Sequence, residues 1–184
     1  MNEDQTKVIK SRGSFFSRYL SKMKTKERTP MKALPENAVM GFLGGFLTIF
    51  VLMALSKFSG NTWIMAPFGA SCVLAFSAWN VPFSQPRNII GGHMISTLVG
   101  LIILSTIGDS LWAVALAVGL AIALMVITKT THPPAGADPL VVILSKSQWS
   151  FLWFPSLFGA LATVVIALII NNLHKERKYP TFWY

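Results

Sequence analysis

The chain has 184 residues, of which 53% are hydrophobic and only 12% are charged. Soluble domains carry about 25% charged residues, so this composition indicates a membrane protein and excludes a chain that is disordered over most of its length. The single cysteine, Cys72, excludes an intramolecular disulfide and a zinc finger built on cysteines.

A basic tail, residues 1–37, opens the chain. It holds nine of the 16 Lys and Arg residues, and residues 174–184 hold three more. Because Lys and Arg concentrate on the cytoplasmic side of a membrane protein, both ends are predicted to be cytoplasmic, which requires an even number of crossings. The tail either lies on anionic lipid, since Phe15 and Tyr19 stand among its basic residues, or is disordered. No nucleic-acid fold follows it, so no nucleic-acid partner is expected.

Four long apolar stretches follow, and each is expected to cross the lipid bilayer as a helix. A bilayer core of about 30 Å needs about 20 helical residues, because a helix rises about 1.5 Å per residue. The four stretches are 38–58, 88–107, 111–128 and 152–173. Three glycines in the first stretch, Gly41, Gly44 and Gly45, suit close contact between helices, and from them we expect a homo-oligomer.

Two shorter apolar stretches, 63–79 and 134–144, lie between the long ones. Each starts in a segment that contains proline and glycine, which interrupt a helix. Each is therefore predicted to be a short broken segment that either re-enters or crosses the membrane. The two match at an offset of 67 residues, since Pro-Phe-Gly-Ala-Ser at 67–71 corresponds to Pro-Ala-Gly-Ala-Asp at 134–138.

The order of long, short and long stretches occurs twice, at 38–107 and at 111–173. We therefore predict an all-α membrane bundle of four long helices and two short segments, arranged as two repeats that are expected to be inverted. If the short segments cross the membrane, there are six crossings, and Arg87 and Lys129 lie on the cytoplasmic side. If the short segments re-enter, there are four crossings and both residues lie outside, against the usual distribution, so we favour six.

The predicted domain organisation has three parts. A basic tail at 1–37 precedes a transmembrane domain at 38–173, and a second basic tail occupies 174–184. Because no secretory or plastid targeting stretch is evident, the expected location is a bacterial inner membrane that the chain crosses several times.

The strongest local feature is the segment 129–138, where polar and charged residues interrupt an apolar region. Such groups are unfavourable in a membrane unless they face the protein interior or water. A helix that begins near Gly136 would direct free N–H groups inward, which favours an anion; the alternative is a tight turn capped by Asp138. The candidate substrate-binding residues here are Lys129, Thr131, His132, Pro133, Pro134, Gly136 and Asp138.

Two further clusters are candidates for the same site. Arg87, followed by Asn88, starts a long helix, and its planar guanidinium suits an oxyanion or, alternatively, a lipid phosphate. His93 can transfer a proton or contact substrate, or it forms a hydrogen bond between helices. The loop at 67–71 supplies Pro67, Gly69 and Ser71, which either complete a polar pocket or belong to a kinked, packed helix.

No enzyme activity, cofactor or metal is predicted. The chain lacks the motifs of nucleotide-binding, hydrolytic and zinc-dependent enzymes, such as a P-loop, GxSxG or HExxH. The alternative that remains open is a membrane enzyme or metal-binding protein that uses His93, His132 and Asp138, although their spacing in the sequence is not typical of a zinc site.

The His-Pro-Pro at 132–134, followed by Ala-Gly-Ala, resembles the HPP family of integral membrane proteins. The resemblance extends to 67–71, to 85–88 and to 91–93, and it covers residues 35–173. Members are usually described as having four transmembrane helices, and plastid and cyanobacterial relatives are implicated in nitrite transport. The resemblance therefore implies a transporter or channel for a small inorganic anion, with nitrite as the expected substrate. The chain departs from the family's pattern at Asp138, where a small uncharged residue is usual.

Overall fold

The computed structural model describes residues 15–29 and 34–183. The chain forms two compact units, Met1–Lys32 and Ala33–Tyr184. In the first unit the described residues contain one short helix, α2 (Phe15–Ser21), whose side chains are all exposed. Residues 1–14 and 30–33 of the predicted basic tail lie outside the described residues.

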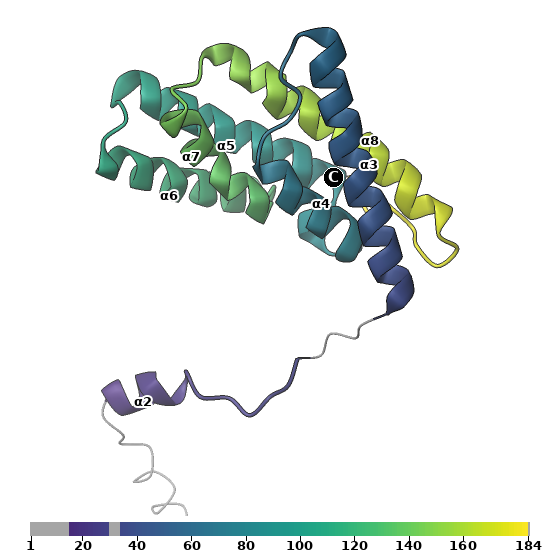
Figure 1. The fold of residues 1–184 in the computed structure, drawn as a ribbon. Coiled ribbons are helices and arrows are strands. Elements are labelled where there is room, and N and C mark those ends of the chain that lie inside the picture. The colour runs from purple at the N-terminus through teal and green to yellow at the C-terminus, as the bar shows by residue number, and fades with distance from the viewer. Residues whose placement is uncertain (1–14, 30–33, 184) are drawn as a thin grey trace, which may run out of the picture. The chain divides into compact units, whose positions relative to one another are not determined.

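The second unit is built from helices, and the described residues contain no strand (Figure 1). Its α-helices are α3 (Pro35–Ser59), α4 (Pro67–Ser77), α5 (Pro86–Thr106), α6 (Leu111–Ile127), α7 (Asp138–Leu144) and α8 (Phe158–Leu173). Shorter helical turns connect them, namely η1 (Pro82–Ser84), η2 (Pro133–Ala137), η3 (Trp149–Leu152) and η4 (Trp153–Leu157).

Within the described residues, three helical segments are long and apolar enough to cross a membrane: Pro35–Ser59, Pro86–Thr106 and Trp149–Leu173. The remaining predicted span, 111–128, corresponds to α6, which has 17 residues. At about 1.5 Å per residue it is about 26 Å long, somewhat less than a bilayer core. The helix ends where Lys129 takes a left-handed φ of 57° and the Thr130 amide donates back to the Met125 carbonyl at 2.9 Å.

The last apolar stretch is not one continuous helix, contrary to the prediction for 152–173. Phe154 has an extended conformation, with φ of −123° and ψ of 116°, and the regular helix α8 starts only at Phe158. Pro155 is the reason, because a proline disfavours the helical conformation of the residue before it. The two short stretches are short as predicted: α4 has 11 residues and begins at Pro67, and α7 has seven residues and follows the proline-containing turn η2.

One end of the bundle is held together by the segment that follows α8. Arg177 donates to Asn37 Oδ1 at 2.8 Å, near the start of α3, and to the Phe76 carbonyl at 2.9 Å, near the end of α4. Tyr179 Oη donates to the Ser84 carbonyl at 2.7 Å, just before α5. The start of α3, the end of α4, the start of α5 and the end of α8 therefore lie at the same end of the unit. The residues at 174–183 pack on the bundle and do not leave it as a free tail.

The opposite end carries a salt bridge between Lys146, after α7, and Asp109, in the loop between α5 and α6. Lys146 Nζ lies 3.0 Å from Asp109 Oδ2, and both side chains are exposed. The hydrogen bond and the positive charge of Lys146 hold the pKa of the Asp109 carboxyl below its ordinary value. This contact places the end of α7 beside the end of α5.

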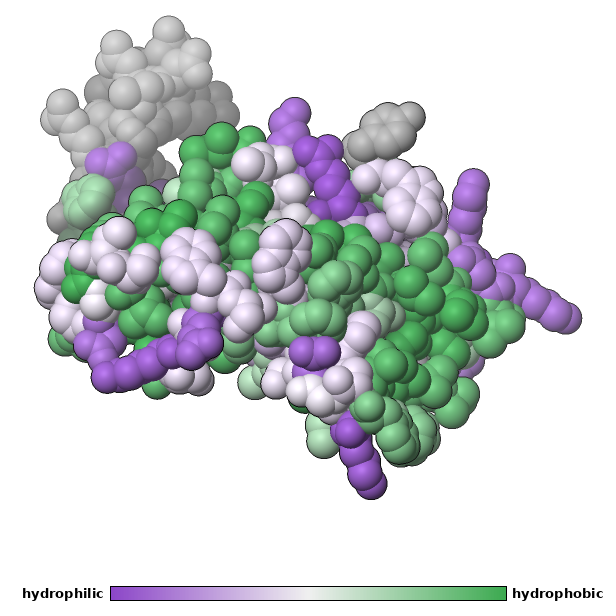
Figure 2. Space-filling model, turned by 90° about the horizontal axis from the view of Figure 1, so that it is seen from above, coloured by the Kyte–Doolittle hydropathy of each residue, from purple (hydrophilic) through white to green (hydrophobic). Residues whose placement is uncertain are grey.

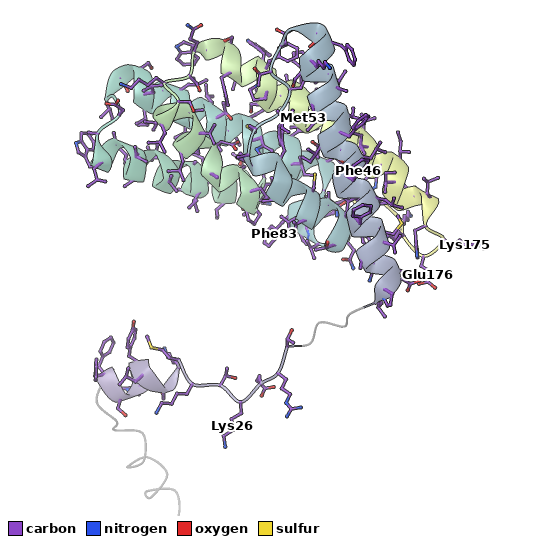
Figure 3. All side chains as sticks on the ribbon, in the orientation of Figure 1. Lys26, Phe46, Met53, Phe83, Lys175 and Glu176 are labelled. Atoms are coloured by element: carbon purple, nitrogen blue, oxygen red, sulfur yellow. The ribbon has the colours of Figure 1, made fainter. Side chains whose placement is uncertain are left out.

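Much of the surface of the second unit is apolar. Phe42, Phe46 and Phe50 stack along one face of α3 and are 60–69% exposed, and Phe46 and Met53 project from this helix in Figure 3. Figure 2 shows hydrophobic residues over large continuous areas of the visible face, with hydrophilic residues in separate patches. Such a surface suits contact with lipid.

The glycines of α3 are used within the chain. A Cβ at Gly44 would overlap the ring of Phe76 on α4, so the absence of a side chain lets the two helices approach each other. The contact from which we expected a homo-oligomer is therefore partly used by α4, and the homo-oligomer stays a prediction.

Candidate functional site

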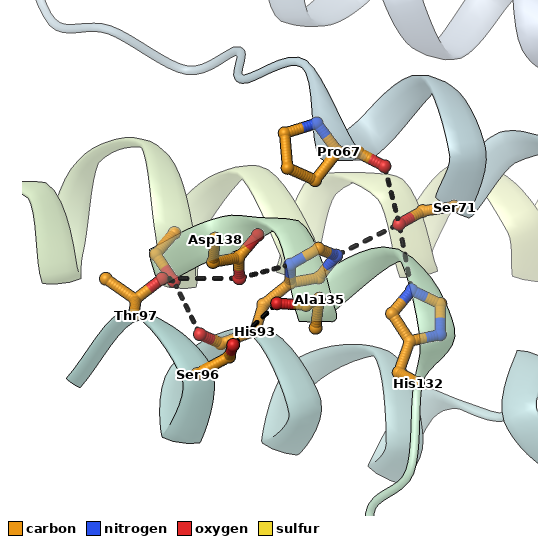
Figure 4. Close-up of polar contacts among 9 residues, drawn as sticks. Pro67, Ser71, His93, Ser96, Thr97, His132, Ala135 and Asp138 are labelled. Carbon is orange, nitrogen blue, oxygen red and sulfur yellow. Dashed lines mark hydrogen bonds and ion pairs between the residues drawn. The ribbon is translucent and has the colours of Figure 1, made fainter. Parts of the chain in front are cut away.

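Ser71 on α4 lies at the centre of a buried polar cluster, shown in Figure 4. Its hydroxyl lies 2.9 Å from Nε2 of His93 on α5 and 2.8 Å from Nε2 of His132. A weaker contact of 3.3 Å joins the hydroxyl to the Pro67 carbonyl. The side chains of Ser71, His93 and His132 have no exposed surface, so the cluster is closed to solvent.

Asp138, the first residue of α7, extends the cluster on the far side of His93. Its Oδ2 lies 2.8 Å from His93 Nδ1 and 3.3 Å from the hydroxyl of Thr97 on α5. Thr97 in turn donates to Ser156 at 2.9 Å, and Ser156 donates to the His93 carbonyl. Asp138 is fully buried, and its Oδ1 has no hydrogen-bond partner among the described residues.

His132 is fixed by the loop before α5 and by a glycine on α5. Its Nδ1 donates to the Phe83 carbonyl at 2.7 Å. A Cβ at Gly92 would lie 2.7 Å from the His132 Cβ and 3.1 Å from the Thr130 carbonyl, so only glycine lets this segment lie against α5. Ser96, one turn further along α5, donates to the Ala135 carbonyl at 2.5 Å and fixes the following turn.

The remaining predicted side chains do not join the cluster. Arg87 Nη2 donates to the Thr128 carbonyl at 3.0 Å, and Asn88 Nδ2 donates to the Thr131 carbonyl at 2.9 Å, so both tie the start of α5 to the segment after α6. The Thr131 hydroxyl contacts the Met125 carbonyl, and Lys129 is exposed. Ser71 therefore faces His132 and not Thr131.

The backbone N–H groups of the two proline-glycine loops are largely used inside the loops themselves. The Phe68 amide donates to the Met65 carbonyl at 3.0 Å, and the Gly69 amide donates to the Ala66 carbonyl at 3.1 Å. In the second loop the Ala135 amide donates to the His132 carbonyl at 3.0 Å. An anion cradle of free N–H groups, as expected from the sequence, therefore has few donors here, and the polar side chains are the groups that remain.

An apolar groove of about 760 Å³ runs between α4 and the segment that contains η2 and α7. It is lined by Ala66, Pro67, Ala70, Val73 and Leu74, and by Pro133, Pro134, Ala137, Leu140 and Val141. Each residue of the first set corresponds to one of the second at an offset of 67 positions. Ser71 and Asp138, which are related by the same offset, lie on these two helices within the buried cluster.

Comparison with known proteins identifies the family. Residues 30–180 match the family described as "HPP, transmembrane region". The chain belongs to the HPP transmembrane family. The match includes every helix of the second unit and all the residues of the cluster.

Two relatives of this HPP protein are transmembrane proteins of Dictyostelium discoideum. One is 35% identical over 196 residues, which is 100% of this chain and 63% of the relative. The other is 39% identical over 129 residues, which is 66% of this chain and 45% of the relative. The chain thus spans less than two thirds of the length of either protein. No solved structure matches it significantly. Both relatives are eukaryotic, so they give no support to the expected bacterial inner membrane.

The three residues proposed for a metal are brought together, but not as ligands of one ion. The ring nitrogens of His93 contact Ser71 and Asp138, and those of His132 contact Ser71 and the Phe83 carbonyl. Within residues 15–29 and 34–183, no three His, Cys, Asp or Glu side chains are grouped so that they could hold a metal ion.

Sequence reasoning missed Thr97, Ser96, Ser156 and the Phe83 carbonyl. A signal existed for two of them, because residues three and four positions after His93 lie on the same face of a helix. Ser156 follows the break at Phe154, and Phe83 contributes a backbone atom, so neither had a recognisable pattern in the sequence.

Proposed function

We propose that this HPP protein transports a small inorganic anion across a membrane, with nitrite as the first substrate to test. The observation that supports it is the buried chain of Ser71, His93, His132 and Asp138. Ionisable groups within membrane segments are unfavourable, and where they occur they generally mark the path of a substrate or an ion. Arg87 and Lys129, at the end of the unit where α5 begins, would attract an anion to that side.

The two halves of the chain are proposed to be repeats. A Cβ at Gly92 on α5 would approach the Thr130 carbonyl and Ala135, and a Cβ at Gly159 on α8 would overlap the Trp63 carbonyl and Phe68. Trp63, Phe68 and Gly92 become Thr130, Ala135 and Gly159 when 67 is added to each number. Equivalent glycines therefore make equivalent contacts in both halves, which supports a duplicated arrangement of the kind common in transporters.

Six crossings are proposed, with both termini on the cytoplasmic side. Trp63 lies beside the end of α3, because its amide donates to the Ser56 hydroxyl at 2.9 Å, whereas α4 ends beside the start of α3. Together, α4 and the coil that joins α3 to it would therefore lead the chain back through the thickness of the bundle. The segment from Lys129 to Lys146 would also cross the bundle. It begins near Arg87, at the start of α5, and ends near Asp109, after the end of α5.

The groove between α4 and α7 is proposed as the seam that opens during transport. The cluster has no exposed surface, so an anion would reach Ser71 and His132 only when these helices separate. Rocking of one repeat against the other is the usual way to expose such a site.

Nitrite uptake by liposomes that contain the purified protein tests the proposal. At equal pH on both sides, uptake should be saturable, and Ser71→Ala should lower it roughly tenfold or more, the effect of losing about 1.4 kcal/mol from a step that uses this hydroxyl. Ser77→Ala, an exposed serine on the same helix, is the matched control. Protein-free liposomes give the rate at which nitrous acid crosses lipid unaided. No saturable uptake of nitrite or of other small inorganic anions by the folded protein would overturn the proposal.

Cross-linking tests the seam. Ala70→Cys and Ala137→Cys line opposite sides of the groove and are combined with Cys72→Ser, because Cys72 is the single native cysteine. A reducible cross-link between the two should stop uptake, and reduction should restore it, because α4 could no longer separate from α7. Each single cysteine variant, treated with the same reagent, is the control. Full uptake by the cross-linked protein would contradict the role of the seam.

A further inference from the structure

The hydrogen bonds of the cluster have a fixed direction, and the Phe83 carbonyl sets it. A carbonyl oxygen only accepts hydrogen bonds, so the proton in the 2.7 Å contact belongs to His132 Nδ1. A neutral imidazole carries one proton, so Nε2 of a neutral His132 is an acceptor. The 2.8 Å contact to Ser71 is then a bond that the serine hydroxyl donates.

The direction of the bond between Ser71 and His132 also determines which atom donates in the contact between Ser71 and His93. A hydroxyl has one proton to donate, and Ser71 gives it to His132. The 2.9 Å contact with His93 Nε2 must then be donated by the ring, so His93 carries a proton on Nε2. The weaker contact to the Pro67 carbonyl, at 3.3 Å, competes for the same serine proton.

A second proton lies between His93 and Asp138. With Nε2 protonated, the 2.8 Å contact from Nδ1 to Asp138 Oδ2 requires a proton on one of these two atoms. The pair therefore holds one proton more than a carboxylate beside a neutral imidazole. It exists either as a carboxylic acid beside a neutral ring or as a carboxylate beside an imidazolium.

The proton shared by His93 and Asp138 is the main charge of the cluster that can move, because no other charged side chain among the described residues bonds to the cluster. Among the described residues, no Lys or Arg side chain bonds to it, since Arg87 donates to the Thr128 carbonyl and Lys129 is exposed. The helices α6 and α8 carry no acidic or basic residue. The titratable group on α4 is the thiol of Cys72, which contacts Thr48 on α3. The hydroxyls of Thr97 and Ser156 complete the contacts of Asp138 and His93.

We propose that Asp138, His93, Ser71 and His132 form a proton relay that couples each transported anion to one proton. This inference rests on the proposed transport function. In the transfer, Asp138 gives its proton to His93 Nδ1, His93 gives its Nε2 proton to Ser71, and Ser71 gives its own proton to His132 Nε2. Asp138 is left as a carboxylate and His132 becomes an imidazolium, so charge is conserved. The Ser71 hydroxyl then donates to His93 instead of His132.

The relay extends from one end of the bundle towards its middle. His93 is seven residues after Pro86 and Thr97 is 11, which places them about 10 Å and about 16 Å along a helix about 31 Å long. His132 contacts the Phe83 carbonyl in the loop before this helix. A proton at His132 therefore lies near the side of Arg87, and a proton at Asp138 lies near mid-membrane, where an anion would need charge compensation most.

The test applies a proton gradient and a membrane potential separately to liposomes that contain the protein. A coupled anion moves without net charge, so an inward proton gradient should raise nitrite uptake roughly tenfold over protein-free liposomes, while a membrane potential set with potassium and valinomycin should leave it unchanged. Uptake that follows the potential and ignores the proton gradient would overturn the relay and leave anion transport standing. No protein-dependent uptake under either force would overturn the proposed function itself.

Variants link the coupling to these residues. Asp138→Asn should abolish the response to the proton gradient, whereas Asp109→Asn, which changes an exposed carboxylate in a loop, should keep it. Ser71→Ala should also abolish the response, and size-exclusion chromatography in detergent checks that each variant is folded. A folded Asp138→Asn or Ser71→Ala protein that keeps the full response would contradict the relay.

Discussion

Gly159→Ala is expected to lower the free energy of unfolding by about 3 kcal/mol or more, the upper part of the range for overpacked cores. A Cβ at this position would overlap the Trp63 carbonyl and the ring of Phe68. The ring can shift, but the carbonyl belongs to the backbone before α4, so relief requires moving α8 away from that segment. Chemical unfolding of the purified protein in detergent micelles measures the change.

Gly119→Ala is the matched control for this prediction. Gly119 is in the middle of α6, is exposed, and would place its Cβ in open space. Alanine in a helix interior is favoured over glycine by about 1 kcal/mol, so this variant should be as stable as the original or slightly more stable. If both variants unfold at the same denaturant concentration, the close packing at Gly159 does not exist in the protein.

Arg177→Ala is expected to lower the free energy of unfolding by about 3 kcal/mol, because hydrogen bonds from a charged donor are lost and buried acceptors are left without partners. Its guanidinium donates to Asn37, Phe76 and Asn171 at 2.8–2.9 Å, and the residue is 6% exposed. These bonds join three helices at one end of the bundle. Detergent unfolding, monitored by circular dichroism, would report the loss.

Two neighbouring variants make the Arg177 prediction specific. Lys178→Ala removes a positive charge from an exposed side chain for which no hydrogen bond is seen, so it should leave stability within about 0.5 kcal/mol. Arg177→Lys keeps the charge but loses the planar guanidinium that reaches separate acceptors. It should therefore lower the free energy of unfolding almost as much as Arg177→Ala does. Equal stability of Arg177→Ala and Lys178→Ala would show that the segment after α8, residues 174–183, which we call the strap, does not hold the helices together.

The cluster residues could be recognised from the sequence, but their pairing could not. Ser71, His93, His132 and Asp138 stand out because polar groups inside apolar stretches need a reason to be there. That Ser71 lies between two imidazoles depends on how α4 packs against α5 and against the segment before η2, which supply His93 and His132, 22 and 61 residues further along the chain. No periodicity encodes that distance.

Other expectations failed for local reasons. The loops at 67–71 and 134–138 were expected to offer free N–H groups, but the amides of Phe68, Gly69 and Ala135 each bond to a carbonyl three residues back. The break at Phe154 was missed because the apolar residues continue through it, although Pro155 was a warning. The helix ends were predicted within a few residues elsewhere, since proline and glycine mark them.

The strap after α8 has a consequence for the order in which the site matures during synthesis. Tyr179 bonds to the Ser84 carbonyl and the Thr181 amide bonds to Gln85 Oε1 at 2.8 Å, so these late residues fix the loop whose Phe83 carbonyl orients His132. A ribosome makes this strap after all the helices of the bundle. Inserted helices without it would contain every side chain of the buried cluster but would lack the support for the Phe83 carbonyl, which accepts the hydrogen bond from His132. We therefore expect the site to acquire its final geometry only after the strap has left the ribosome and docked.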